Sequence, residues 1–205
     1  MTMVKFCGIR TPADTAIVNR LRPDFIGMVF VPGRKRTIGI DTAVDISSNL
    51  DPDIIPVGVF SDPTIEDVLR VTDTDAIQVI QLHGSESEEF IEEVGERTAL
   101  PIIKAFTART KEEVKAACRT RAEYVMFDSG AGTGKTFDWS VLEDPPRPFF
   151  LAGGLNPDNV YEAVTRLHPL AVDVSSGIET EDNKDEFKMQ RFMESVFEAD
   201  GSMRS

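Results

Sequence analysis

The chain alternates short apolar runs with longer amphipathic stretches. The apolar runs have the length of β-strands and are rich in Val, Ile and Phe, which favour strands. We expect eight strands, at residues 3–7, 25–30, 54–60, 76–83, 101–106, 123–128, 148–154 and 170–176. Because a helical pattern or a loop follows each run, the strands should pair in parallel through crossover connections.

Eight such units predict an α/β fold with a single (β/α)8 barrel, also called a TIM barrel. The 205 residues give about 26 residues per unit, which is at the compact end for this fold. An open doubly wound sheet also alternates strands and helices and stays open as the alternative. We expect the barrel to span residues 1–197 and residues 198–205 to form a frayed tail.

Several helix starts can be predicted from capping residues. Thr11-Pro12, Asp62-Pro63 and Asn156-Pro157 have the pattern of an N-cap followed by proline in the first helical turn. The segment GSESEEFIEEVG carries an N-cap serine and acids in its first turn.

Composition and charge narrow the function classes. The 41% hydrophobic and 28% charged content is typical of a globular protein, and no apolar run reaches the roughly 18–20 residues of a membrane span. The start of the chain lacks the pattern of a signal peptide, so we expect a cytoplasmic location. The net charge of −13 argues against a nucleic-acid partner. It fits either ordinary solvated helix faces or adaptation to high salt.

The two cysteines, Cys7 and Cys118, match no zinc or redox spacing. We expect no disulfide between them, because such bridges are rare in the cytoplasm. Cys118 lies in a helical pattern and is interpreted as a small buried hydrophobic residue.

Glycines and serines gather at the ends of the last two predicted strands. The set consists of Gly153, Gly154, Ser175, Ser176 and Gly177. Barrels commonly bind phosphate after strands seven and eight through backbone N–H groups, and glycine lets the backbone approach the anion. The alternative is that these glycines only turn the chain. Two glycine-containing strand ends favour a phosphate site.

A thiol and a carboxyl end two other predicted strands. Side chains alternate along a strand, so Lys5 and Cys7 should face the barrel interior, with Asp128 at its mouth. The strands of Cys7 and Asp128 lie three steps apart in a closed ring, so a small molecule could meet both groups. One would serve as base and the other as acid. Lys5 would help Cys7 to ionise. The alternatives are a buried hydrophobic residue for Cys7 and an N-cap for Asp128.

The cluster Arg34-Lys35-Arg36 is unusual in so acidic a chain. It follows the second predicted strand, and an arginine there could bind a substrate carboxylate through two hydrogen bonds. The alternative is a solvated loop.

The segment SGAGTGKT (129–136) almost matches a nucleotide-binding P-loop. However, Ser129 replaces the first glycine, and Pro145-Pro146 cut short the helix that a P-loop should open. We therefore expect no nucleoside triphosphate to bind through Lys135.

Taken together, the strand ends resemble a known family. The segments KFCGIR, GMVFVPGRKR, VGVF, QLHG, FDSGAGTGKTFDW, LAGGLNPDNV and DVSSGIE, in this order, are similar to those of phosphoribosylanthranilate isomerases. The matching motifs run from residue 5 to about residue 179.

The resemblance implies an Amadori rearrangement of N-(5-phosphoribosyl)anthranilate to 1-(o-carboxyphenylamino)-1-deoxyribulose 5-phosphate. It implies that Asp128 is the general acid and Cys7 the general base, and that Arg36 binds the anthranilate carboxylate. Gly153, Gly154 and residues 175–177 match the phosphate site, and Asp173 could meet the polar middle of the substrate. No metal or organic cofactor is implied. The partner is a small phosphorylated molecule, and the enzyme would be a monomer or a homodimer.

One position departs from the family pattern: Arg34 stands where a serine is expected, which leaves the contacts of its loop open. His83 lies at the same rim without an assigned role. A related isomerase of histidine biosynthesis is a rival interpretation. It would need an aspartate in place of Cys7 and a second phosphate site after the third strand, where GVFSDPT stands instead. A barrel that binds phosphate without catalysis is a second alternative.

Overall fold

A computed structural model describes residues 1–128 and 139–202. Eight parallel strands are hydrogen-bonded in sequence order into a closed barrel. They are β1 (Met3–Cys7), β2 (Phe25–Val29), β3 (Ile55–Phe60), β4 (Val79–Leu82), β5 (Ile102–Phe106), β6 (Tyr124–Asp128), β7 (Phe149–Ala152) and β8 (Ala171–Val174). The (β/α)8 prediction is confirmed. An open doubly wound sheet is excluded because a closed ring has no edge strands.

The remaining elements connect or follow these strands. They are α1 (Pro12–Leu21), α2 (Ile40–Ser48), α3 (Ile65–Thr72), α4 (Glu88–Thr98), α5 (Lys111–Ala117), α6 (Val160–Leu167), α7 (Glu186–Ser202), the 3-10 helices η1 (Trp139–Leu142) and η2 (Ser176–Ile178), and the short strands β9 (Glu179–Thr180) and β10 (Asn183–Lys184). Among the helices described, none is both long enough and apolar enough to cross a membrane.

The helix starts agree with the sequence in two cases and differ in two. Thr11 caps α1 with Pro12 in its first turn, and Ser87 caps α4. In contrast, α3 begins after Thr64, whose hydroxyl accepts from the Asp67 N–H. Asp62 cannot cap that helix because its backbone is left-handed, with φ of 49°. The helix α6 begins after Asn159, three residues later than predicted.

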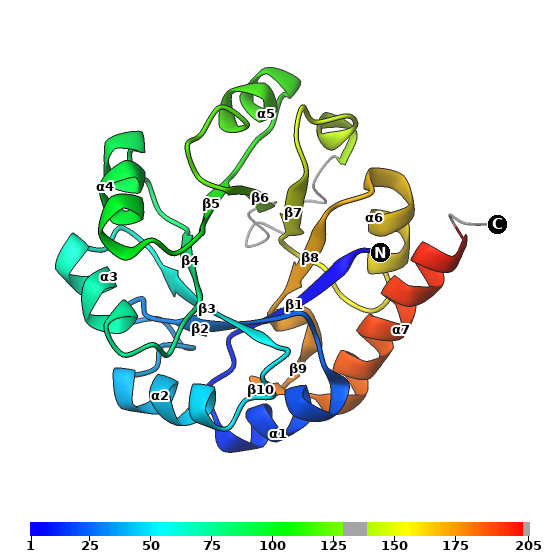
Figure 1. The fold of residues 1–205 in the computed structure, drawn as a ribbon. Helices are drawn as coiled ribbons and strands as arrows, with labels where there is room; N and C mark the ends of the chain where they lie inside the picture. The colour runs from blue at the N-terminus through cyan, green and yellow to red at the C-terminus, as the bar shows by residue number, and fades with distance from the viewer. Residues whose placement is uncertain (129–138, 203–205) are drawn as a thin grey trace. The chain divides into compact units, whose positions relative to one another are not determined.

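The chain divides into two compact units, each described by itself. The first unit comprises Met1–Lys5, Phe106–Thr120 and Val125–Ser205, and the second comprises Phe6–Ala105 and Arg121–Tyr124. In the second unit, β2, β3 and β4 pair in register. Helices α1 to α4 lie along the outer side of these strands, shown from blue to green in Figure 1.

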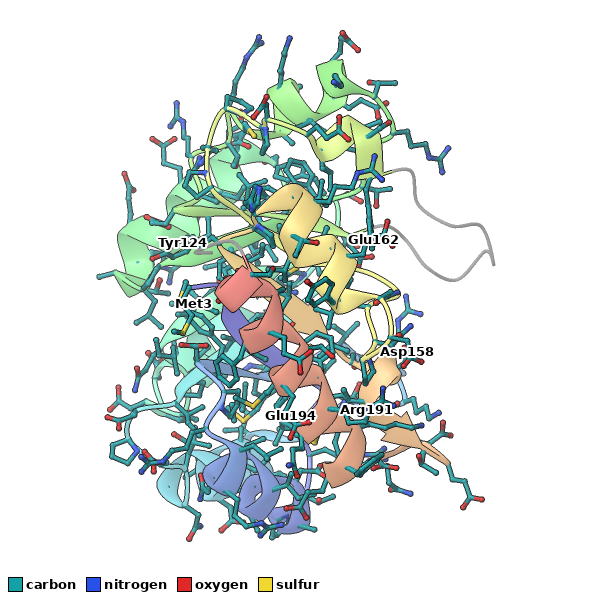
Figure 2. The ribbon with its side chains drawn as sticks, turned by 90° about the vertical axis from the view of Figure 1, so that its right-hand side faces the viewer. Met3, Tyr124, Asp158, Glu162, Arg191 and Glu194 are labelled. Carbon is teal, nitrogen blue, oxygen red and sulfur yellow. The ribbon has the colours of Figure 1, made fainter. Side chains whose placement is uncertain are left out.

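In the first unit, β7 pairs with both β6 and β8. Helices α6 and α7 lie side by side (Figures 1 and 2). The helix α7 presents one face to the interior, because its buried side chains recur at helical spacing. They are Met189, Phe192, Met193, Val196, Ala199 and Asp200.

The C-terminal helix is fastened to the start of the chain at its last turn. The Asp200 carboxylate accepts hydrogen bonds from the Thr2 backbone N–H at 2.7 Å and from the Thr2 hydroxyl at 3.0 Å. Both residues are buried, 6% exposed in each case. The expected tail from residue 198 is therefore helical as far as Ser202, because Asp200 anchors this turn. Residues 203–205 lie outside the described part of the chain.

We expect Asp200→Ala to destabilise the protein by about 1–3 kcal/mol, because it leaves a buried backbone N–H without its acceptor. Urea unfolding would measure this loss, with Glu198→Ala as the control. Glu198 is exposed on the same helix, and its replacement should change the free energy of unfolding by less than about 0.5 kcal/mol. Equal stabilities of the two variants would contradict a role of the Thr2–Asp200 contact in holding α7.

Candidate active site

The predicted site residues lie at the carboxyl ends of four barrel strands. Cys7 is the last residue of β1 and Asp128 the last of β6. Gly153 and Gly154 directly follow β7, and Ser175 directly follows β8. In barrel enzymes, substrates bind at this end of the strands. The strand ends thus carry the residues that the sequence singled out.

A buried ion pair joins the first and the last of the three segments that make up the first unit. Lys5 Nζ lies 2.7 Å from Asp173 Oδ1, and their side chains are 0% and 9% exposed. Two buried charges are tolerated when each neutralises the other. The ammonium of Lys5, which the sequence places next to Cys7 on one strand face, therefore has a carboxylate partner. In turn, the pair fixes the orientation of the Asp173 carboxylate.

The two glycine-containing loops of the first unit touch each other. A Cβ atom added to Gly177 would lie 2.0 Å from the backbone oxygen of Leu155, so only glycine allows the loop after β8 to pack on the loop after β7. Gly153 and Gly154 have φ angles of 89° and 67°, a region that glycine adopts without strain. The loop geometry therefore requires glycine at these positions.

Two asparagines brace the loop after β7. Asn159 Nδ2 donates to the Gly154 carbonyl at 3.0 Å, and Asn159 Oδ1 accepts from the Asn156 N–H at 2.8 Å. The Asn156 side chain in turn accepts from the Asp158 N–H at 2.8 Å. These bonds turn the chain into α6 and fix the Gly154 backbone.

In the second unit, Cys7 is fixed by the turn that follows it. The N–H groups of Gly8 and Ile9 both donate to the Gly27 carbonyl, at 2.8 Å and 3.0 Å. Gly8 has a φ angle of 84°, which a residue with a side chain rarely adopts. Cys7 is 8% exposed, so most of the residue is buried by protein and a small part of it contacts solvent.

The basic cluster lies on a structured loop between β2 and α2. Its far end returns to β2 through a bridge between Val29 and Thr37. Arg10 reaches from the loop after β1 and donates through Nη1 to the Lys35 carbonyl at 3.3 Å. Arg34 and Lys35 are exposed, whereas Arg36 is half-buried. Among the three basic residues, Arg36 is thus the one with the most restricted side chain.

His83 follows β4. Its Nδ1 lies 2.9 Å from Nε2 of Gln81, which is 1% exposed. The donor and acceptor roles in this hydrogen bond depend on the tautomer of the ring. In either case the bond holds the imidazole beside the buried amide of Gln81.

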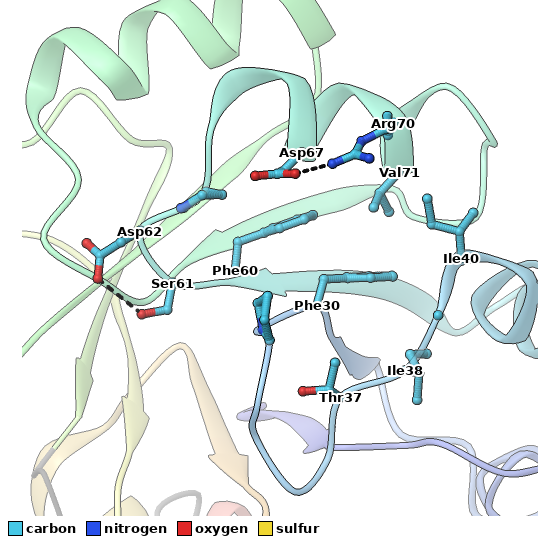
Figure 3. A pocket seen from close by; sticks show the side chains of 13 residues that line it. Phe30, Thr37, Ile38, Ile40, Phe60, Ser61, Asp62, Asp67, Arg70 and Val71 are labelled. Atoms are coloured by element: carbon cyan, nitrogen blue, oxygen red, sulfur yellow. Dashed lines mark hydrogen bonds and ion pairs between the residues drawn. The ribbon is translucent and has the colours of Figure 1, made fainter.

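A hollow of about 340 Å³ lies behind the loop that carries Arg36. Figure 3 shows Phe30 and Phe60 stacked inside it, with ring centroids 5.3 Å apart. Residues of the loops after β2 and β3, among them Thr37 and Asp62, line it together with Val71 of α3. The Asp67 carboxylate at its rim is bonded to Arg70. We assign no substrate to this hollow.

Sequence reasoning missed the partners that hold the site residues. Alternation along β4 would have placed Gln81 on the face of His83. The contact of Arg10 with Lys35 depends on loop geometry and leaves no signal in the sequence. The segment SGAGTGKT, with Lys135, lies outside the described residues.

Comparison with known proteins identifies the family. Residues 4–195 match the profile described as "N-(5'phosphoribosyl)anthranilate (PRA) isomerase". An isomerase of this name from Endomicrobium trichonymphae is 42% identical over 90% of this chain and 93% of its own length. The crystal structure of phosphoribosyl anthranilate isomerase from Thermotoga maritima is 35% identical, with a TM-score of 0.88, and the match covers 97% of this chain and all of that one.

A second solved structure carries a ligand. It is a phosphoribosyl anthranilate isomerase in complex with reduced 1-(o-carboxyphenylamino)-1-deoxyribulose 5-phosphate. It is 34% identical, with a TM-score of 0.86, over 97% of this chain and 100% of that chain. From its sequence and its fold, the chain belongs to the N-(5'-phosphoribosyl)anthranilate isomerase family.

Proposed function

We propose that this chain catalyses the Amadori rearrangement of N-(5-phosphoribosyl)anthranilate to 1-(o-carboxyphenylamino)-1-deoxyribulose 5-phosphate in tryptophan biosynthesis. The family match over residues 4–195 carries the proposal. Expression of the chain in a bacterial strain that lacks this isomerase should restore growth without tryptophan. Absence of growth, with the folded protein present in the cells, would contradict the proposal.

The proposed chemistry is a pair of proton transfers. Asp128 in its protonated form gives a proton to the ribose ring oxygen as the bond from C1′ to that oxygen breaks. The nitrogen lone pair then forms a Schiff base at C1′. Cys7 as thiolate removes the proton from C2′, and the freed electron pair gives an enolamine, which tautomerises to the ketone. This scheme uses no metal and no organic cofactor.

We assign the substrate phosphate to the paired loops of the first unit, at Gly153, Gly154, Ser175, Ser176 and Gly177. The geometry of the loops supports this assignment. Three of these positions are glycines, so an anion can approach the backbone N–H groups without meeting a side chain. Asp173 is assigned to the polar middle of the substrate. Its ion pair with Lys5 orients the side chain, whose oxygens can accept hydrogen bonds from the substrate.

A substrate with a second phosphate fits the second unit poorly. A second phosphate would need backbone N–H donors in the loops after β3 and β4. Two of those N–H groups already donate to carboxylates. Glu86 accepts from the Asp62 N–H at 2.8 Å, and Asp62 accepts from the Ser85 N–H at 2.6 Å. The Asp62 carboxylate would repel a phosphate, and Glu86 is held in place by an ion pair with Lys104, whose Nζ lies 3.0 Å from Glu86 Oε2. This supports the substrate with one phosphate over the larger one of histidine biosynthesis.

We expect Arg36→Met to act through substrate binding. Loss of a bidentate carboxylate partner costs roughly 1.5–3 kcal/mol, which corresponds to a rise in KM of roughly 10- to 150-fold. Arg34→Met is the control from the same loop, and its exposed side chain should matter by no more than about 1 kcal/mol. An unchanged KM in Arg36→Met would indicate that Arg34 or Lys35, and not Arg36, binds the carboxylate of the substrate.

The proposal also covers the surroundings of the enzyme. We infer that it works in the cytoplasm, as a monomer or a homodimer, on a small phosphorylated molecule and without a nucleic-acid partner. Cys7 and Cys118, which both lie in the described part of the chain, are not joined by a disulfide, which suits a reducing compartment. The net charge of −13 opposes binding to nucleic acid.

A further inference from the structure

A second buried ion pair lies next to the loop after β8. Lys184 Nζ is 2.9 Å from Glu179 Oε1, and the side chains are 1% and 7% exposed. The same ammonium donates to the Ser175 carbonyl at 3.0 Å. A charged donor makes a hydrogen bond about twice as strong as a neutral one. Lys184 therefore binds the backbone of Ser175, the first residue of the loop that we assign to the phosphate.

The hairpin that carries Lys184 is itself well braced. Its strands pair antiparallel, with Lys184 opposite Glu179. The Lys188 ammonium donates to the Glu179 carbonyl at 2.7 Å, and the Thr180 hydroxyl donates to the Asp185 carboxylate at 2.6 Å. The latter bond also lowers the pKa of Asp185, which accepts from the Lys188 N–H at the start of α7. These bonds fix the hairpin that carries Lys184 to the start of α7.

The contact with Ser175 fixes the direction of the next N–H group. The carbonyl of Ser175 and the N–H of Ser176 belong to one planar trans peptide, so they point in opposite directions. Because the carbonyl points at Lys184, the Ser176 N–H points away from it.

We propose that Lys184 is a positioning residue for the phosphate group: it holds the peptide between Ser175 and Ser176 so that its N–H is directed at the anion. This inference rests on the proposed phosphate site. Lys184 does not touch the substrate, and its effect should therefore appear in phosphate affinity and KM with kcat preserved.

The experiment measures the Kd of inorganic phosphate by 31P NMR titration, and KM and kcat with N-(5-phosphoribosyl)anthranilate. Lys184→Met should raise the Kd and the KM by about tenfold or more and leave kcat within about twofold. Lys184→Met removes the ammonium that neutralises the buried Glu179 carboxylate, so this variant could unfold. The double variant Lys184→Met/Glu179→Leu is therefore made alongside it. Replacing both charges by apolar side chains is often neutral for stability, and the double variant should show the same weakened binding.

Two controls isolate the contact with Ser175. Glu179→Gln keeps an oxygen acceptor and leaves the bond from Lys184 to Ser175 in place, so the Kd of phosphate should stay within about twofold. Arg191→Met removes a cation from the exposed pair with Asp158 in the same unit (Figure 2). It should change neither the Kd of phosphate nor the KM of the substrate.

A folded double variant with the parent's Kd for phosphate would overturn the role of Lys184, as would a parent that binds no phosphate. Failure of the proposed function would give a different result. The parent would bind phosphate and the double variant would not, but the parent would not convert N-(5-phosphoribosyl)anthranilate.

Discussion

Cys7→Ser should reduce turnover to a small fraction of the parent's while KM stays nearly the same. A thiol has a pKa near 8.5 and supplies some thiolate at neutral pH, whereas the serine hydroxyl is far too weak an acid to ionise there. Serine is only slightly smaller than cysteine, and the turn after it is held by the Gly8 and Ile9 N–H groups. The fold should therefore be preserved, and the loss should fall on kcat.

Cys118→Ser is the matched control for this variant. Burial raises the pKa of the Cys118 thiol, so this residue supplies less thiolate, and it should not affect turnover. General base catalysis contributes roughly 10²- to 10⁴-fold. Retention of more than about a tenth of the parent's turnover in Cys7→Ser would thus remove Cys7 from the role of base.

The second large effect is expected for Asp128→Asn. The amide has the shape of the carboxyl but cannot deliver a proton to the ribose ring oxygen, so turnover should fall by roughly 10²-fold or more. The variant should still bind reduced 1-(o-carboxyphenylamino)-1-deoxyribulose 5-phosphate, the product analogue, because binding does not need the proton.

Asp144→Asn serves as the control, since Asp144 is exposed after η1 and should have no part in the chemistry. If Asp128→Asn turned over at nearly the parent's rate, the acid would be another group. His83, which directly follows β4, would be the first residue to test.

The barrel itself was predictable because its signal is repeated along the chain. Each strand is a short apolar run, and each helix has its own periodicity, so local patterns determine the order of the elements. Parallel pairing is also compatible with an open doubly wound sheet; the number of repeated units, eight, is what favoured the closed ring that the structure has. Element ends were less predictable: Asp62 was expected to cap α3, but its carboxylate accepts from the Ser85 N–H of another loop. A tertiary contact thus overrode the local signal.

The same distinction applies to the candidate site. Cys7, Asp128 and the glycines could be proposed from the sequence because strand ends can be recognised in it and because their residue types are chemically distinctive. The bracing residues were not found. Lys184 lies in a polar hairpin whose turn residues, Glu181 and Asp182, both have positive φ, without the Asn-Gly or Asp-Gly that usually signals such a turn. Nothing local shows that a lysine there is buried or that it reaches Ser175.

The most direct test of the account is to follow the purified chain with N-(5-phosphoribosyl)anthranilate. The fluorescence of its anthranilate group and the mass of the product should be recorded together. We predict that the fluorescence disappears at a rate proportional to enzyme concentration, with a product of unchanged mass that co-elutes with 1-(o-carboxyphenylamino)-1-deoxyribulose 5-phosphate. Decay no faster than in buffer, or release of free anthranilate by hydrolysis, would contradict the proposed isomerisation.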